Sequence, residues 1–145
     1  MDKYFRRILC PVDFDENSMA ALKLATQLAE ESGGLLYLIH VDSAPLSRPV
    51  FPTAPSAVPS EEASRSRLAR IARERLSGKV RYEVLVRFGA PFEVITQTAE
   101  EVDADVVVMA THGRTGAARM VLGSVAEHVV RTCTRPVLTV RPNQP

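Results

Sequence analysis

The stretch DADVVVMATHGRTG, residues 103–116, decides the fold that this sequence predicts. Its apolar part, Val106 to Ala110, is a continuous run of strand length, which is typical of a central parallel strand covered on both faces. A loop that contains Gly113 and Gly116 follows the run. Because ligands of parallel α/β sheets bind at the carboxyl ends of the strands, this loop is the first place to look for a site.

Four further strands and four helices surround this stretch. Strands are predicted at residues 8–12, 35–41, 80–88, 106–110 and 137–141, and helices at 15–33, 60–78, 91–102 and from 123 onward. This alternation predicts a three-layer α/β/α fold with a five-stranded parallel sheet. The strand at 80–88 alternates apolar and polar residues and is placed at an edge, whereas the most apolar strands are placed inside. The resulting strand order is 3-2-1-4-5, a Rossmann-like arrangement.

The composition predicts one ordinary globular domain that spans residues 1–145. Hydrophobic residues make up 46% and charged residues 24% of the chain, and the net charge of +1 gives no reason to attract nucleic acid or a membrane surface. We find no apolar run of about 18–20 residues for a membrane span, and no secretory signal. The two cysteines, Cys10 and Cys133, favour a reducing compartment, the cytoplasm. Five prolines within residues 43–59 predict a long loop.

The predicted strand order brings two loops to one crevice. The first and fourth strands are neighbours, and their helices leave toward opposite faces, so residues 11–14 and 110–116 both lie at the opening. The last helix is predicted to begin at Gly123-Ser124, with Ser124 and Glu127 forming a capping box. Its first N–H groups, together with the nearby glycines, predict a cradle for phosphate.

Each of these features also has a purely structural interpretation. A glycine after a strand and a serine before a helix occur in any α/β turn, and Asp13 can cap the following helix instead of contacting a ligand. The five arginines between residues 65 and 75 fit a solvated helix face better than a partner surface. His40 and His128 are expected to pack within the fold, because neither has a partner at the spacing of metal ligands.

With these residues in order, the chain resembles the universal stress protein family over nearly its whole length. The family signature is G-x-x-G, nine residues and G-[ST], and its second part fits Gly113, residues 114–122 and Gly123-Ser124. Residues 11–13, Val41 and residues 136–140 fit the family pattern as well. Ala110 stands where the first glycine belongs, and its methyl group narrows the approach of a ligand to the backbone and disfavours a positive φ.

The resemblance implies a site for ATP, with Mg²⁺, in the crevice. In nucleotide-binding members of the family, the positions that match Asp13 and Val41 hold the ribose and adenine, and those that match residues 109–113 and 123–125 hold the phosphates. His112 and Arg114 are counted with the phosphate loop, although exposed or backbone-bonded side chains are common at such positions. The implied site residues are Pro11, Val12, Asp13, Val41, Met109, Ala110, His112, Gly113, Arg114, Gly123, Ser124 and Val125.

The function implied is that of a cytoplasmic, nucleotide-responsive stress regulator. We assign no catalytic or metal-ligating residue, because the sequence has no G-x-x-x-x-G-K-[ST], G-x-G-x-x-G or G-x-S-x-G and no lysine in a crevice loop. ATP hydrolysis is therefore expected to be slow and incidental at most. The last strand, Val137 to Arg141, is expected to form a homodimer by pairing with its copy. The alternatives are a dimeric interaction protein that binds no nucleotide, and slow phosphoryl or adenylyl transfer in the same crevice.

Overall fold

The computed structural model describes residues 4–42, 61–111 and 123–141. The predicted proline-rich loop at 43–59 and the site candidates His112, Gly113 and Arg114 lie outside these residues. The elements are β1 (Arg7–Pro11), α1 (Glu16–Ser32), β2 (Leu35–Asp42), α2 (Glu61–Leu76), β3 (Arg81–Phe88), α3 (Pro91–Glu101), β4 (Val106–Ala110), α4 (Ser124–Thr132) and β5 (Val137–Val140).

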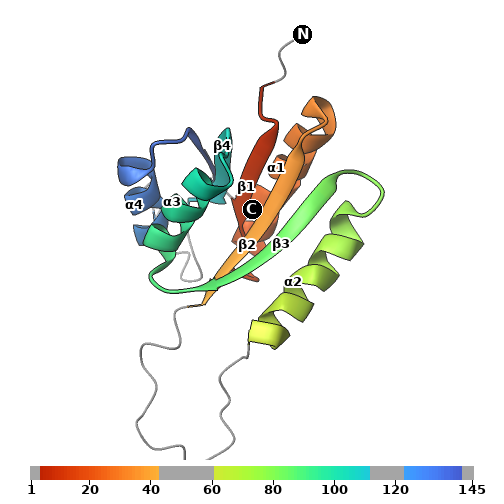
Figure 1. Cartoon of the computed structure of the whole chain (residues 1–145), viewed down its shortest axis with the longest axis horizontal. Coiled ribbons are helices and arrows are strands. Elements are labelled where there is room, and N and C mark those ends of the chain that lie inside the picture. The colour runs from red at the N-terminus through yellow and green to blue at the C-terminus, as the bar shows by residue number, and fades with distance from the viewer. Residues whose placement is uncertain (1–3, 43–60, 112–122, 142–145) are drawn as a thin grey trace, which may run out of the picture.

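The five strands form one parallel sheet in the order β3-β2-β1-β4-β5, which confirms the predicted architecture. Helices α1 and α2 cover one face of the sheet, and α3 and α4 cover the other (Figure 1). Because α1 follows β1 and α4 follows β4, the helices of these two neighbouring strands leave toward opposite faces. This is the arrangement that opens a crevice at the carboxyl ends of the strands.

The core divides into two apolar layers because successive side chains of a strand point to opposite faces. In β1, Ile8 and Cys10 pack on the face covered by α1 and α2, whereas Leu9 packs on the face covered by α3 and α4. The central strand β4 alternates in the same way, with Val108 on the first face and Val107 on the second. All five of these side chains are fully buried, which explains why β4 and the part of β1 that follows the exposed Arg7 are apolar.

The ladder between β1 and β4 is short. It joins Ile8 to Val106 and Leu9 to Val107, whereas β1 and β2 remain paired over the whole length of β1, as far as Pro11 and Ile39. The carboxyl ends of β1 and β4 are therefore not tied to each other by the ladder.

Helix α1 is capped at both ends. The Asp15 side chain accepts a hydrogen bond from the backbone N–H of Ser18 at 2.8 Å, and Gly33 ends the helix in the left-handed conformation with φ 70°. None of the helices in the described part of the chain has both the length and the hydropathy that a bilayer crossing requires.

The predicted capping box of the last helix is wrong. Gly123 is the N-cap residue, with φ −61° and ψ 158°, and it supplies no side chain to the cap. Ser124 is therefore the first helical residue, one position too late to cap the helix, and Glu127 pairs instead with Arg131 at 3.1 Å. The helix thus begins with a bare glycine cap and an exposed serine.

Candidate functional site

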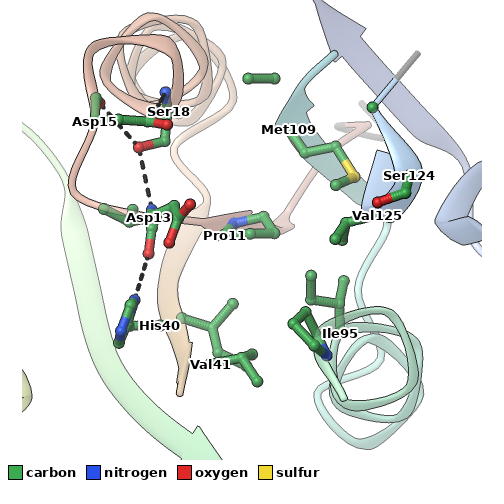
Figure 2. Close-up of a pocket in the computed structure, with 15 residues that line it drawn as sticks. Pro11, Asp13, Asp15, Ser18, His40, Val41, Ile95, Met109, Ser124 and Val125 are labelled. Atoms are coloured by element: carbon green, nitrogen blue, oxygen red, sulfur yellow. Dashed lines mark hydrogen bonds between the residues drawn. The ribbon is translucent and has the colours of Figure 1, made fainter. Parts of the chain in front are cut away.

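A cavity of about 240 Å³ lies at the carboxyl ends of β1, β2 and β4 (Figure 2). The first residues of α4 and the first turns of α1 and α3 complete its wall. Its lining residues are Pro11, Val12, Asp13, Asp15, Ser18, Ile39, His40, Val41, Pro91, Ile95, Met109, Ala110, Gly123, Ser124 and Val125.

The structure brings nine of the twelve predicted site residues to this one cavity. They are Pro11, Val12, Asp13, Val41, Met109, Ala110, Gly123, Ser124 and Val125. The remaining three, His112, Gly113 and Arg114, lie outside the described residues. The nine come from four separate segments, so the predicted strand order is what places them together.

The polar side of the cavity is formed by the loop between β1 and α1. The backbone N–H of Asp13 donates to the hydroxyl of Ser18 at 3.1 Å, and that hydroxyl donates to the backbone carbonyl of Asp15 at 3.1 Å. Since Asp15 caps α1, the exposed Asp13 is not the helix cap. The carboxylate of Asp13 lies between the loop and Pro11 in Figure 2.

One atom of this loop has an unmet hydrogen-bonding capacity. Oδ1 of Asp15 accepts the Ser18 N–H, but Oδ2 is buried and has no hydrogen-bond partner in the described structure. A buried carboxylate oxygen without a donor is costly. A ligand hydroxyl, amino group or water that reaches this edge of the cavity would satisfy it.

The opposite side of the cavity is apolar. The side chains of Val41, Ile95, Met109 and Val125 gather around the open space in Figure 2. Apolar walls with a few polar groups placed at one end are typical of small-molecule sites. This cavity therefore suits a ligand that has a flat apolar part and hydroxyl groups.

The start of α4 supplies the site for negative charge. Gly123 and Ser124 line the cavity, where the helix dipole is positive and the first backbone N–H groups have no partner within the helix. Because Ser124 does not cap the helix, its exposed hydroxyl is not committed to that role. The Gly123 N–H donates to the Thr111 carbonyl, so the donors that remain for an anion are the N–H groups of Ser124 and Val125 and the Ser124 hydroxyl.

Ala110 differs from the expected glycine without straining the backbone. It is the last residue of β4, pairs with Val140 and lines the cavity. The described non-glycine residues with positive φ are Phe5, Phe14 and Asp103, so position 110 has no need of a glycine for its backbone conformation. What the alanine adds is the volume of one methyl group.

Six lining residues were not among the predicted site residues: Asp15, Ser18, Ile39, His40, Pro91 and Ile95. All six lie within predicted strands or helices rather than in the crevice loops. Ile39 lies opposite Pro11 in the parallel register, so aligning the predicted strands would have found it. His40 Nδ1 donates to the backbone carbonyl of Val12 at 2.8 Å, a contact for which the sequence carries no local signal.

The described residues contain no group of three histidine, cysteine or acidic side chains that could hold a metal ion. His40 stacks on Phe14 with ring centroids 4.3 Å apart, and His128 stacks on Phe92 at 4.6 Å. His40 therefore packs within the fold, whereas His128 is exposed and packs on Phe92 at the surface, so the prediction for His128 is wrong.

Comparison with known proteins identifies the family. The sequence model of the universal stress protein family matches residues 4–141. Universal stress protein MJ0531 of Methanocaldococcus jannaschii is 30% identical over 97% of this chain and 84% of its own length. Universal stress protein G of Salmonella typhimurium is 33% identical over 94% of this chain and 99% of its own. The chain belongs to the universal stress protein family.

Solved structures show the same fold. The structure of MJ0577 matches with a TM-score of 0.78 and 24% identity, covering 98% of this chain and 99% of that one. A universal stress protein in complex with cAMP matches with a TM-score of 0.70 and 24% identity, over 97% and 99% of the two chains. The protein from Archaeoglobus fulgidus in complex with dAMP matches with a TM-score of 0.63 and 21% identity, over 95% and 98%.

Proposed function

We propose that this protein binds an adenine nucleotide in the cavity between β1 and β4 and acts as a nucleotide-responsive regulator. The observation that carries the proposal is the convergence of nine predicted site residues on one cavity, with an acidic loop at one side and a helix N-terminus at another. The cAMP and dAMP complexes of two structural relatives support the choice of adenine, because both ligands are adenine nucleotides with one phosphate.

The proposed roles follow the polarity of the wall. The adenine lies against the apolar side near Val41, where the side chain offers a wall and the end of β2 offers backbone groups. The ribose hydroxyls donate to Asp13. The phosphates lie toward the start of α4, where the backbone N–H groups of Ser124 and Val125 donate to their oxygens.

ATP with Mg²⁺ is the proposed physiological ligand. Mg²⁺ usually keeps several waters and binds one or two carboxylates together with substrate phosphates, rather than a cage made by the protein alone. The cavity fits this mode, since its acidic side chains are Asp13 and Asp15. Mg²⁺ would arrive with the phosphates and keep most of its waters.

The Ser18 hydroxyl and the His40 ring are engaged in holding the loop rather than in activating a nucleophile. Ser18 bonds both Asp13 and Asp15, and the His40 ring bonds the Val12 carbonyl. This arrangement supports regulation by binding, with at most slow incidental hydrolysis. We further propose that the protein acts in the cytoplasm as a homodimer through β5, whose Leu138 is 38% exposed.

Nucleotide content and affinity test the proposal. Protein purified without added nucleotide should release an adenine nucleotide on denaturation, and calorimetry should detect AMP and Mg²⁺–ATP binding below millimolar concentration. Gly123→Val places two methyl groups at the phosphate end and should weaken binding at least about tenfold, which corresponds to about 1.4 kcal/mol. The backbone of residue 123, with φ −61°, accepts a side chain, so the variant should fold.

Gly123→Ala is the graded control and should lose less affinity than Gly123→Val. Arg131→Ala, at the far end of the same helix, should bind like wild type. If wild type binds no adenine nucleotide at millimolar concentration, the proposed site is wrong and the interaction-protein alternative replaces it.

A further inference from the structure

Three side chains from separate elements form a stack beside the cavity. The guanidinium carbon of Arg67, from α2, lies 4.3 Å from the centre of the Phe14 ring. The ring of His40, from β2, packs on the same Phe14 ring, with a centroid distance of 4.3 Å and an interplanar angle of 37°. Phe14 thus belongs to the loop between β1 and α1 but is held by residues of two other elements.

The backbone of Phe14 is in a conformation that a side chain disfavours. Its φ is 59°, in the left-handed region, where residues other than glycine are uncommon. Such a conformation persists when surrounding contacts hold it in place. Asp13 and Asp15 flank Phe14 in sequence and both line the cavity, so the conformation of residue 14 determines how the two carboxylates are presented.

The remaining contacts of the loop fix its main chain. The Val12 carbonyl accepts from His40, and the Asp13 N–H donates to Ser18. The stack on Phe14 adds a contact to the side chain between the two carboxylates. Arg67 is the exposed member of that stack.

Arg67 does not line the cavity and is exposed. Within the described ranges it forms no ion pair, whereas its neighbour Arg65 pairs with Glu61 at 3.1 Å. A guanidinium over an aromatic ring is attracted by the partial negative charge on the ring face, and it also shields the ring from water. The contact with Phe14 is therefore the interaction that the structure assigns to Arg67.

We propose that Arg67 is a positioning residue for the nucleotide site: by packing on Phe14 it holds the loop so that Asp13 faces the ribose. The inference rests on the proposed function for its ligand. It couples α2, a helix outside the crevice, to nucleotide affinity without any contact between that helix and the ligand. It also separates Arg67 from the other arginines of α2, which remain a solvated face.

The affinity test uses AMP and five variants, one of them a double variant. Arg67→Ala should weaken AMP binding by about two- to fivefold, the loss expected from an exposed cation–π contact. Arg67→Lys keeps a cation on the ring and should recover part of the loss. Arg70→Ala removes an exposed arginine from the same helix and should bind like wild type. Phe14→Leu should also weaken binding, and adding Arg67→Ala to it should change little further.

Two results of the affinity test overturn the proposal. If Arg67→Ala and Arg70→Ala bind AMP equally well, Arg67 does not position the site. If Arg67→Ala costs as much in the Phe14→Leu background as in wild type, Arg67 acts on the ligand directly and not through Phe14.

A ligand-free measurement separates this inference from the proposed function. In protein without nucleotide, hydrogen exchange at the Asp13 N–H, which donates to Ser18, should quicken in Arg67→Ala and stay unchanged in Arg70→Ala. If wild type binds no AMP, the proposed function fails, and this exchange still decides whether Arg67 holds the loop. Unchanged exchange in Arg67→Ala overturns the positioning role.

Discussion

Cys10 lies fully buried in β1, and burial raises the pKa of its thiol to about 12 from its ordinary value of 9.0. The unfolded chain loses this proton at lower pH than the native protein does. The stability that Cys10 contributes is therefore complete below about pH 9 and is lost as pH rises toward 12. Denaturant titrations of wild type and Cys10→Ala should show a gap in unfolding free energy that narrows over this range.

The alanine variant is needed because tyrosines and lysines titrate in the same range. Cys10→Ala removes the thiol and leaves those groups in place, so the difference between the two proteins reports the thiol alone. A gap that stays constant from pH 9 to 11 contradicts the assignment. The other cysteine, Cys133, is half-buried and free, and both proteins retain it.

Single residues also show where sequence analysis of the site ends. The segments at Asp13, Val41 and Gly123 could be placed together because each lies at the end of a predicted strand or at the start of a predicted helix, and the strand order brings these ends to one edge of the sheet. The contact of His40 with Val12 depends on side-chain geometry across two strands. The packing of Arg67 on Phe14 depends in addition on a rare backbone conformation. Neither contact corresponds to a pattern that can be seen in the amino-acid sequence.

At the scale of elements, Gly34 controls how closely α1 and β2 approach the residues before β1. A Cβ at this position would lie 2.6 Å from the carbonyl oxygen of Phe5 and 2.7 Å from that of Arg6. The Arg6 carbonyl accepts the Leu35 N–H at 2.7 Å, beside the first residue pair of the β1–β2 ladder. Gly34→Ala should therefore lower the free energy of unfolding by about 3 kcal/mol, measured by urea denaturation.

Gly33→Ala is the matched comparison, because Gly33 requires its left-handed φ of 70°. The variant should lose about 1 kcal/mol from backbone strain. A loss at Gly34 no larger than that at Gly33 would mean that the neighbouring backbone moves aside and that the close approach is not essential.

The types of the elements and the order of the strands could be predicted from the apolar residues. Their spacing along the chain and the length of each continuous apolar run directly indicate which faces of an element are buried. The continuous run of β4 and the alternation of β3 placed the two strands at the inside and the edge of the sheet, as observed. Element ends were less predictable, since they depend on single hydrogen bonds. β5 ends at Val140 instead of Arg141, and α4 takes Gly123 as its cap although Ser124 is the better capping residue.

At the scale of the whole molecule, the open edge of β5 is the expected dimer contact. The carbonyls of Pro136 and Val140 accept N–H groups from β4 and the following residue, so the backbone groups of Thr139 face away from β4. Thr139→Pro removes a donor on this open side, and Leu138→Asp places a charge on the exposed apolar side chain. Light scattering should show a dimer for wild type and a monomer for both variants.

Thr139→Ala, which keeps the backbone donor, should remain dimeric. A monomeric wild type, or variants that keep the wild-type mass, contradicts pairing through β5. Cooperative urea unfolding of each variant would confirm that the change lies in assembly and not in folding.

Because the ladder between β1 and β4 is short, the sheet has two parts. Strands β3, β2 and β1 form one part, and β4 and β5 form the other. Helix α1 packs against strands of both parts and connects them on its own face of the sheet. The cavity has walls from both parts, because Pro11 belongs to β1 and Ala110 belongs to β4. An occupant that touches both walls would add contacts between the two parts of the sheet, beyond the end of the short β1–β4 ladder.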